Sequence, residues 1–222
     1  MIDKRKFYIN GTWINPIIKN DFEVINPSNE QPYAFISLGS KKDIDLAVNV
    51  AKKAFITWSQ VDRKEKISLL ENLLKIYKSR WDEITQTMSQ EMGAPLDWSS
   101  SAQTSSGADH INDFILRLKN FEFEKRFNKN SNNYIVYEPI GVCGLITPWN
   151  WPINQITLKV IHAFATGCTM ILKPSEIAPM SGIIFAEIIH EAGFPAGVFN
   201  LVNGDGDGVG TDLSSHHDID MI

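Results

Sequence analysis

The sequence predicts an α/β protein in which helices cover both faces of a parallel sheet. From residue 140 onward, short apolar segments alternate with helical segments, and these segments lack the polar alternation of a half-exposed strand. Of the 222 residues, 43% are hydrophobic and 21% are charged, a composition typical of a globular protein with a large core. A net charge of −5 argues against a generally basic nucleic-acid-binding protein.

Strands and turns are predicted for the first 40 residues. Residues 7–9 and 12–14 flank Asn10-Gly11, a dipeptide typical of a type I′ hairpin because both residues tolerate positive φ. Residues 23–25 lead into Asn26-Pro27, which predicts a strand that ends in a turn.

Three helices are predicted for the next segment. The first starts at Ser40, whose three-residue spacing to Asp43 is that of a capping box. The second is a single long helix over residues 62–92, with apolar residues at steps of three and four, and Gly93 and Pro95 end it. The third covers residues 99–118.

A hairpin arm is predicted over residues 119–139. Residues 121–127 alternate aromatic and charged side chains, residues 128–133 form a polar turn, and residues 134–137 return as a second strand. The arm is either a local flap or an edge that pairs with another subunit.

The parallel region follows. The predicted strands and helices are strands 141–146, 169–172 and 198–202, helices 152–166 and 178–192, a short helix 207–215, and the start of a fourth strand at 219–222. Ligands of open α/β sheets bind outside the carboxyl ends of such strands, so the residues that follow each strand are the candidate site.

The segment after the first parallel strand contains Asn150 between two tryptophans and two prolines. The Asn150 amide has the chemistry to stabilise an oxyanion in a dry site. It is equally suited to cap the helix that starts at Pro152.

The segments that follow the second and third parallel strands each have two possible roles. Lys173 and Glu176 have the spacing to reach ribose hydroxyls, or they belong to a surface turn in which Ser175 or Glu176 caps the next helix. The glycine-rich turn 204–210 either binds a phosphate or is a tight connection that needs positive φ. It departs from the usual dinucleotide fingerprint because residue 209 is valine.

Two other groups of residues have side chains that can be reactive or bind a metal. Cys143 and Cys168 lie in apolar contexts typical of inert buried cysteines. For His216 and His217 we expect no metal site, because adjacent side chains should diverge and no further ligand completes the spacing.

Four ordered signatures make the sequence resemble the NAD(P)-dependent aldehyde dehydrogenase superfamily over essentially its whole length. They are residues 139–142 (PIGV), 147–152 (TPWNWP), 172–176 (LKPSE) and 199–204 (FNLVNG). The resemblance implies a variant Rossmann domain with a helical amino-terminal region and a hairpin arm that serves oligomerisation. It also explains why the ordinary glycine fingerprint is missing.

The resemblance implies a role for each candidate site residue. The residues expected to line the cofactor are Ile146, Thr147, Pro148 and Trp149, those around its ribose are Lys173, Ser175 and Glu176, and those that allow close approach are Gly206 and Gly210. Because a carboxylate at Glu176 would repel a 2′-phosphate, NAD is expected rather than NADP. Asn150 is expected to be the side-chain half of the oxyanion hole, and Trp151, Gln155, Leu158 and Lys159 to lie along the substrate tunnel, with Lys159 in a proton relay.

The resemblance also implies that part of the enzyme is absent from these residues. We expect residues 1–118 to be the helical and hairpin part of the cofactor-binding domain, 119–139 the arm, and 140–222 the truncated NAD-binding core. The nucleophilic cysteine and the general-base glutamate would follow residue 222, so this chain alone should not oxidise its small-molecule aldehyde substrate. The alternative is a non-catalytic NAD-binding remnant or a partner subunit of a longer homologue.

The remaining expectations concern surroundings and assembly. Because the sequence lacks both an apolar segment of about 20 residues and a signal peptide, we expect a cytoplasmic protein without a membrane or nucleic-acid partner. The arm suggests a homo-oligomer.

Overall fold

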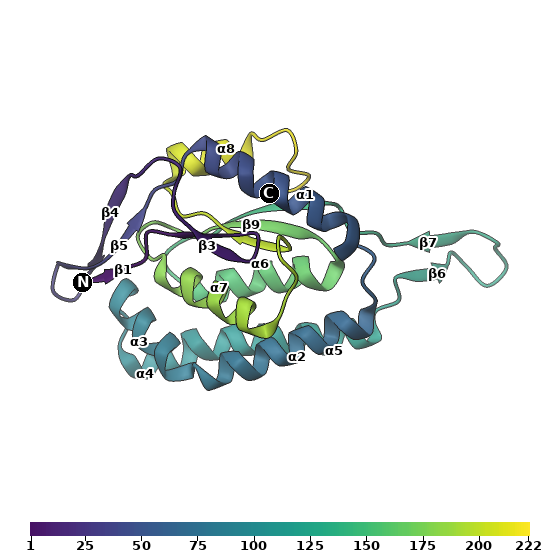
Figure 1. Cartoon of the computed structure of the whole chain (residues 1–222). Helices are drawn as coiled ribbons and strands as arrows, with labels where there is room; N and C mark the ends of the chain where they lie inside the picture. The colour runs from purple at the N-terminus through teal and green to yellow at the C-terminus, as the bar shows by residue number, and fades with distance from the viewer.

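The computed structural model describes all 222 residues, and Figure 1 shows a body of sheets and helices from which one hairpin projects. The strands are β1 (Ile2–Asp3), β2 (Phe7–Ile9), β3 (Thr12–Ile14), β4 (Asp21–Asn26), β5 (Gln31–Ser37), β6 (Glu124–Arg126), β7 (Tyr134–Val136), β8 (Val142–Ile146), β9 (Thr169–Lys173) and β10 (Phe199–Leu201). The helices are α1 (Lys41–Trp58), α2 (Arg63–Ser79), α3 (Trp81–Met92), α4 (Leu96–Trp98), α5 (Ser105–Asn120), α6 (Pro152–Thr166), α7 (Met180–Ala192) and α8 (Thr211–Ser214), with π-helices η1 (Ser99–Thr104) and η2 (Gly206–Gly210).

The main sheet has the strand order β3-β2-β10-β9-β8. Strands β8, β9 and β10 are parallel, as predicted, but β2 pairs antiparallel with β10 through Tyr8 and Leu201, so the sheet is mixed. The predicted fourth parallel strand is reduced to a single bridge between Met221 and Cys143. The amino-terminal hairpin therefore extends the sheet on one side, and the last residues begin to extend it on the other.

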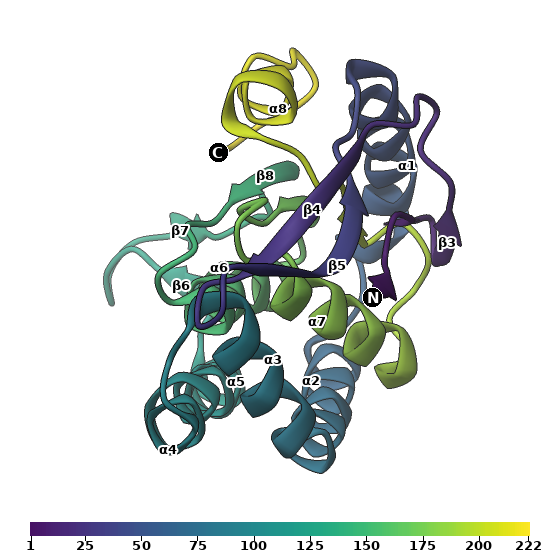
Figure 2. The ribbon, with the colours of Figure 1, turned by 90° about the vertical axis from the view of Figure 1, so that its left-hand side faces the viewer.

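Alternate residues of the central strand β9 face two separate hydrophobic clusters. Met170 and Leu172 belong to a cluster of 38 buried residues shared with α2, α5, α6 and α7. Ile171 belongs to a cluster of 11 buried residues shared with α1. This period of two confirms that both faces of the sheet are covered. Figure 2 shows the arrangement, with α1 on one side of the sheet and α7 on the other, followed by α2, α3 and α5.

A second sheet, β1-β5-β4, lies beside α3. The hairpin β2–β3 turns at Asn10 and Gly11, with φ values of 55° and 75°, as the Asn-Gly dipeptide predicts. Helix α1 starts as predicted, and the Asp43 carboxylate accepts hydrogen bonds from the Ser40 N–H at 2.8 Å and the Ser40 hydroxyl at 2.6 Å.

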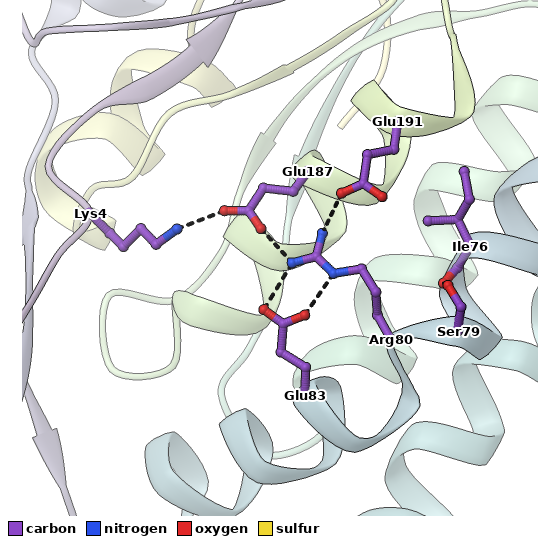
Figure 3. Close-up of polar contacts among 7 residues, drawn as sticks. All are labelled: Lys4, Ile76, Ser79, Arg80, Glu83, Glu187 and Glu191. Carbon is purple, nitrogen blue, oxygen red and sulfur yellow. Dashed lines mark hydrogen bonds and ion pairs between the residues drawn. The ribbon is translucent and has the colours of Figure 1, made fainter.

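The prediction of one long helix over residues 62–92 is wrong, because Arg80 separates α2 from α3. The Arg80 backbone leaves the helical region at φ −102° and ψ 20°. Its guanidinium lies 2.7 Å from Glu83, 2.6 Å from Glu187 and 3.0 Å from Glu191. Figure 3 shows this network, in which Lys4 also contacts Glu187 at 2.7 Å. The α7 residues in these contacts lie more than 100 residues from Arg80 in the sequence. The local apolar periodicity therefore does not indicate the break.

The third predicted helix is present, but it begins as α4 and the π-helix η1 before α5. In η1 the Ser101 hydroxyl donates to the Asp97 carbonyl at 2.7 Å, so serine side chains bond to the backbone of the preceding turn. Thr104 and Thr85 contact each other at 3.0 Å, which joins η1 to α3. Such π-turns are frequent at functional sites.

The predicted arm is confirmed as the antiparallel pair β6–β7, which projects from the body in Figure 1. Phe127, Tyr134 and Val136 on the arm are exposed. None of the helices combines the length and the apolar composition that a bilayer span requires.

Candidate functional site

The carboxyl ends of the three parallel strands meet around Lys173. The Thr147 N–H, just after β8, donates to the Lys173 carbonyl at 3.2 Å. The Lys173 ammonium donates to the Gly204 carbonyl, which follows β10, at 2.5 Å and lies 3.4 Å from a Glu176 oxygen. Three of the segments singled out in the sequence are therefore in direct contact at one edge of the sheet.

The Lys173 side chain is buried at this edge of the sheet. It is 3% exposed, and this desolvation lowers the pKa of its ammonium, while the nearby Glu176 carboxylate opposes the shift. A third contact is the Pro174 carbonyl at 3.2 Å. The ammonium thus holds the glycine turn and Glu176 in place, and the half-buried Glu176 carboxylate remains accessible from outside.

The glycine turn after β10 is not a connection that needs positive φ. None of its four glycines has a positive φ, so that interpretation is wrong. Glycine is needed at residue 204 because a Cβ there would lie 2.3 Å from the Val209 side chain. Asp205 caps the turn by accepting the Gly208 N–H at 2.7 Å. The surroundings of Gly206 are open, and Gly210 lies against Lys173.

The segment after β8 forms one wall of this edge. Ile146 is half-buried, whereas Pro148 and Trp149 are exposed, Trp149 to 52%. Thr147 is buried, and its hydroxyl has no hydrogen-bond partner. An unpaired buried hydroxyl is uncommon and marks a position where a further polar group fits.

Asn150 does not cap the following helix. Trp151 occupies the cap position of α6, no side chain bonds to the first turn, and the Asn150 side chain is exposed. Its backbone carbonyl accepts a hydrogen bond from the Gln103 amide of η1 at 3.5 Å. The capping interpretation is therefore wrong, and the Asn150 amide is left free for another partner.

The predicted tunnel residues lie at the start of α6 and along its length. Trp151 packs edge-on against Trp98 of α4 at 5.0 Å between ring centroids. Gln155, Leu158 and Lys159 are half-buried, and Leu158 lines an apolar groove of about 960 Å³ between α5 and α6. This groove does not include the predicted cofactor residues.

Glu91, which sequence reasoning did not single out as a site residue, caps the start of α7. Its carboxylate is 1% exposed and accepts the Met180 N–H at 2.6 Å, the Ser181 N–H at 3.0 Å and the Ser181 hydroxyl. Burial raises the pKa of Glu91 to about 7, although the bonds from Ser181 oppose the shift. The prediction that Ser175 or Glu176 caps this helix is wrong. The local sequence gives no signal for this role, because Glu91 lies near the end of α3 and its partners are on α7.

Both cysteines are buried, Cys143 at 4% exposure inside β8 and Cys168 at 3% just before β9. The contact with the Cys168 side chain raises the pKa of the Cys143 thiol, and burial of the thiol raises it further. The expectation that His216 and His217 diverge is wrong, because their rings stack at 5.0 Å with an interplanar angle of 8°. The expectation that no further ligand completes the spacing is also wrong, because ligand atoms of His216, His217 and Asp218 lie within 4.8 Å of one another. His216 accepts the Asp218 N–H and faces Asp45, so both of its ring nitrogens are engaged within the protein.

Comparison with known proteins gives one consistent result. The sequence pattern of the "Aldehyde dehydrogenase family" matches residues 13–222. A 3-succinoylsemialdehyde-pyridine dehydrogenase from a Pseudomonas species is 46% identical over all of this chain and 46% of its own length.

The solved structures agree with the sequence relatives. An aldehyde dehydrogenase from Bartonella henselae superposes with a TM-score of 0.97 and 52% identity over 99% of this chain and 46% of its own. A betaine aldehyde dehydrogenase from Staphylococcus aureus, solved with NAD+, has a TM-score of 0.92 and 31% identity over 98% of this chain and 44% of its own. The chain thus spans about half the length of the relatives that it matches.

Proposed function

The chain belongs to the aldehyde dehydrogenase family, and we propose that it forms the NAD-binding part and the oxyanion-hole side chain of an enzyme that oxidises an aldehyde to a carboxylic acid. The observation that carries the proposal is the contact of three signature segments around Lys173 at the carboxyl edge of the sheet. Ligand sites of open α/β sheets lie at this edge.

The residues at this edge fit NAD. The Glu176 carboxylate would accept hydrogen bonds from a ribose hydroxyl, and the open space around Gly206 would let the dinucleotide approach the backbone. The unpaired Thr147 hydroxyl would gain a partner, while Ile146, Pro148 and Trp149 would form an apolar wall. Ser175 is buried beside Glu176 and would keep this turn in shape, and Gly210 would keep Lys173 close to the turn.

Bound NAD supplies the hydride acceptor of the reaction. The free amide of Asn150 would donate a hydrogen bond to the oxygen that becomes negative when an aldehyde is attacked. The aldehyde would lie along α6, in contact with Trp151, Gln155, Leu158 and Lys159. Lys159 would take part in a proton relay. Neither Cys143 nor Cys168 is proposed as the nucleophile, because Cys143 is buried inside β8 and Cys168 is buried just before β9.

Titration calorimetry with the purified chain tests the cofactor proposal. We expect NAD to bind at least about tenfold more tightly than NADP, because Glu176 repels a 2′-phosphate. Glu176→Gln should narrow that difference, whereas Glu122→Gln, which removes an exposed carboxylate on the arm, should not. Equal affinity for the two cofactors in the unaltered chain would contradict the proposal. NADH formation from an aldehyde by this chain alone would show that a nucleophile has been missed.

A second proposed role is assembly through the arm. The arm has exposed side chains at Phe127, Tyr134 and Val136, and its strand edges are unpaired. Both features favour pairing with another copy or with a longer relative. We place this assembly in the cytoplasm. Light scattering tests this role. We expect an assembly larger than a monomer, and Val136→Lys should reduce its mass, whereas a strictly monomeric profile would exclude the role.

A further inference from the structure

A cavity of about 640 Å³ lies beside the amino-terminal hairpin, and its lining contains none of the residues of the proposed NAD site. Its volume is within the range of small-molecule sites. It is lined by residues that precede or follow β2 and β3 and by Glu187 of α7. Lys4 and Glu187, which Figure 3 shows in contact, form one side of it.

The lining has a net positive charge although the chain as a whole is negative. Lys4, Arg5, Lys6 and Lys19 face two acidic residues, so the lining has a net charge of +2 while the chain has −5. Ion pairs offset part of this charge. Within the lining, Arg5 pairs with Asp3 at 2.7 Å, and the remaining pairs involve Asp21, which lies outside the lining, and Glu187. Asp21 pairs with both Arg5 and Lys19, and Glu187 pairs with both Lys4 and Arg80.

Lys6 is the cation of this cavity that has no carboxylate within ion-pair distance. Its side chain is exposed, so it can turn toward a ligand without breaking an existing bond. Because its ammonium is not neutralised by a carboxylate, Lys6 is the position in the lining where an anion gains most.

Trp13 is the hydrophobic residue of the lining. It lies on the edge strand β3 and is held by Tyr8, with ring centroids 5.3 Å apart. An indole at the wall of a cationic cavity offers a flat surface on which a ring can pack.

From these observations we propose that the cavity binds a small organic anion that contains a planar ring, with the anionic group at Lys6 and Lys19 and the ring against Trp13. The class is that of aromatic carboxylates. The site is separate from the NAD site and does not depend on the function proposed above.

Titration calorimetry of the full chain with benzoate tests the charge requirement. We expect saturable benzoate binding that weakens as salt is added, and little binding of the uncharged analogue benzamide. Lys6→Gln should weaken benzoate binding about fivefold, as expected for one exposed charge contact. Lys78→Gln is the matched control, because it removes an exposed lysine charge on α2 and should leave the affinity unchanged.

Cyclohexanecarboxylate tests the ring requirement. It carries the same charge without the flat ring, and we expect it to bind more weakly than benzoate in the unaltered chain but equally in Trp13→Leu. Amide shift perturbations should map to residues 3–19, and circular dichroism should show that each variant is folded. Absence of saturable binding, equal loss in Lys6→Gln and Lys78→Gln, or equal binding of benzoate and benzamide would overturn the proposal.

Discussion

Helices α6 and α7 each follow a parallel strand of the same sheet, yet their first turns are completed differently. At α7 the buried carboxylate of Glu91 accepts two backbone N–H groups and a hydroxyl. At α6 no side chain caps the first turn, Pro152 removes one N–H, and the nearby Asn150 amide is exposed and unpaired.

The difference separates a helix start held by an internal side chain from one whose nearby amide has no partner. A helix start that is buried within the protein needs an internal partner, because each orphan N–H in the interior is destabilising. A helix start at a ligand edge can keep its polar groups free for the ligand. The first residues of both helices are buried, so the two helix starts differ in whether a side chain from elsewhere in the chain reaches the first turn.

Removal of the internal cap should have the largest effect on stability. Glu91→Ala leaves two buried N–H groups without a partner, so we expect a loss of about 3 kcal/mol in the free energy of unfolding. Urea denaturation at neutral pH measures it. The matched variant Glu122→Ala, on the exposed arm, should change the value by less than about 0.5 kcal/mol. Similar values for both variants would mean that Glu91 does not support α7.

The pKa of Glu91 predicts a pH dependence. Because burial raises the pKa of Glu91 to about 7, above its ordinary value of 4.5, the folded state binds the proton more tightly than the unfolded state. This contribution is therefore fully present below pH 4.5 and is lost as the pH rises through 7, by about 3 kcal/mol. Urea midpoints from pH 4.5 to 8 should show this decline relative to Glu91→Gln. Parallel curves for the two proteins would exclude it.

The outer face of α7 is held by Arg80, and this contact should have an intermediate effect. Arg80 is 16% exposed in its side chain and pairs with Glu187 and Glu191 of α7. We expect Arg80→Met to lower the free energy of unfolding by about 1–2 kcal/mol. Arg117→Met breaks an ion pair whose arginine is 70% exposed, and should lower it by less than about 0.5 kcal/mol. Equal effects would show that the Arg80 network does not support α7.

The smallest effect is expected at the open helix start. Since the Asn150 side chain caps nothing, Asn150→Ala should change thermal or urea stability by less than about 0.5 kcal/mol. A loss of about 1 kcal/mol is the value for removal of a true cap, and would restore the capping interpretation. The two helix starts would then both depend on a side-chain cap, and the distinction between them would not hold.

Local patterns predicted most of the elements after residue 140. Helix α6 begins at Pro152 and ends before Gly167, whose φ of 87° ends it, and both signals are visible in the sequence. Strand β9 is a run of apolar residues between two helices, so its burial on both faces follows from its composition. The Asn10-Gly11 turn and the start of α1 at Ser40 were equally local.

The partners of polar side chains could not be predicted in this way. The burial of the Lys173 ammonium against Gly204 depends on the pairing of β9 with β10, and the cap on α7 comes from Glu91, 89 residues before it. The stacking of His216 and His217 depends on α1, which contributes Asp45 and Lys52 to the same turn.

The sequence by itself determined which segments become strands and helices in the sheet region, where the turns lie, and which residues stand at the carboxyl ends of the strands. Those properties depend on neighbours three or four positions away, through backbone sterics and hydrophobic period. Only the tertiary structure decided that β2 joins the sheet and that Arg80 divides a helix. It also decided that the Asn150 amide has no hydrogen-bond partner while the Glu91 carboxylate caps α7. These outcomes depend on burial and on contacts between distant segments, which bring charges and hydrogen-bond partners together only after the chain has folded.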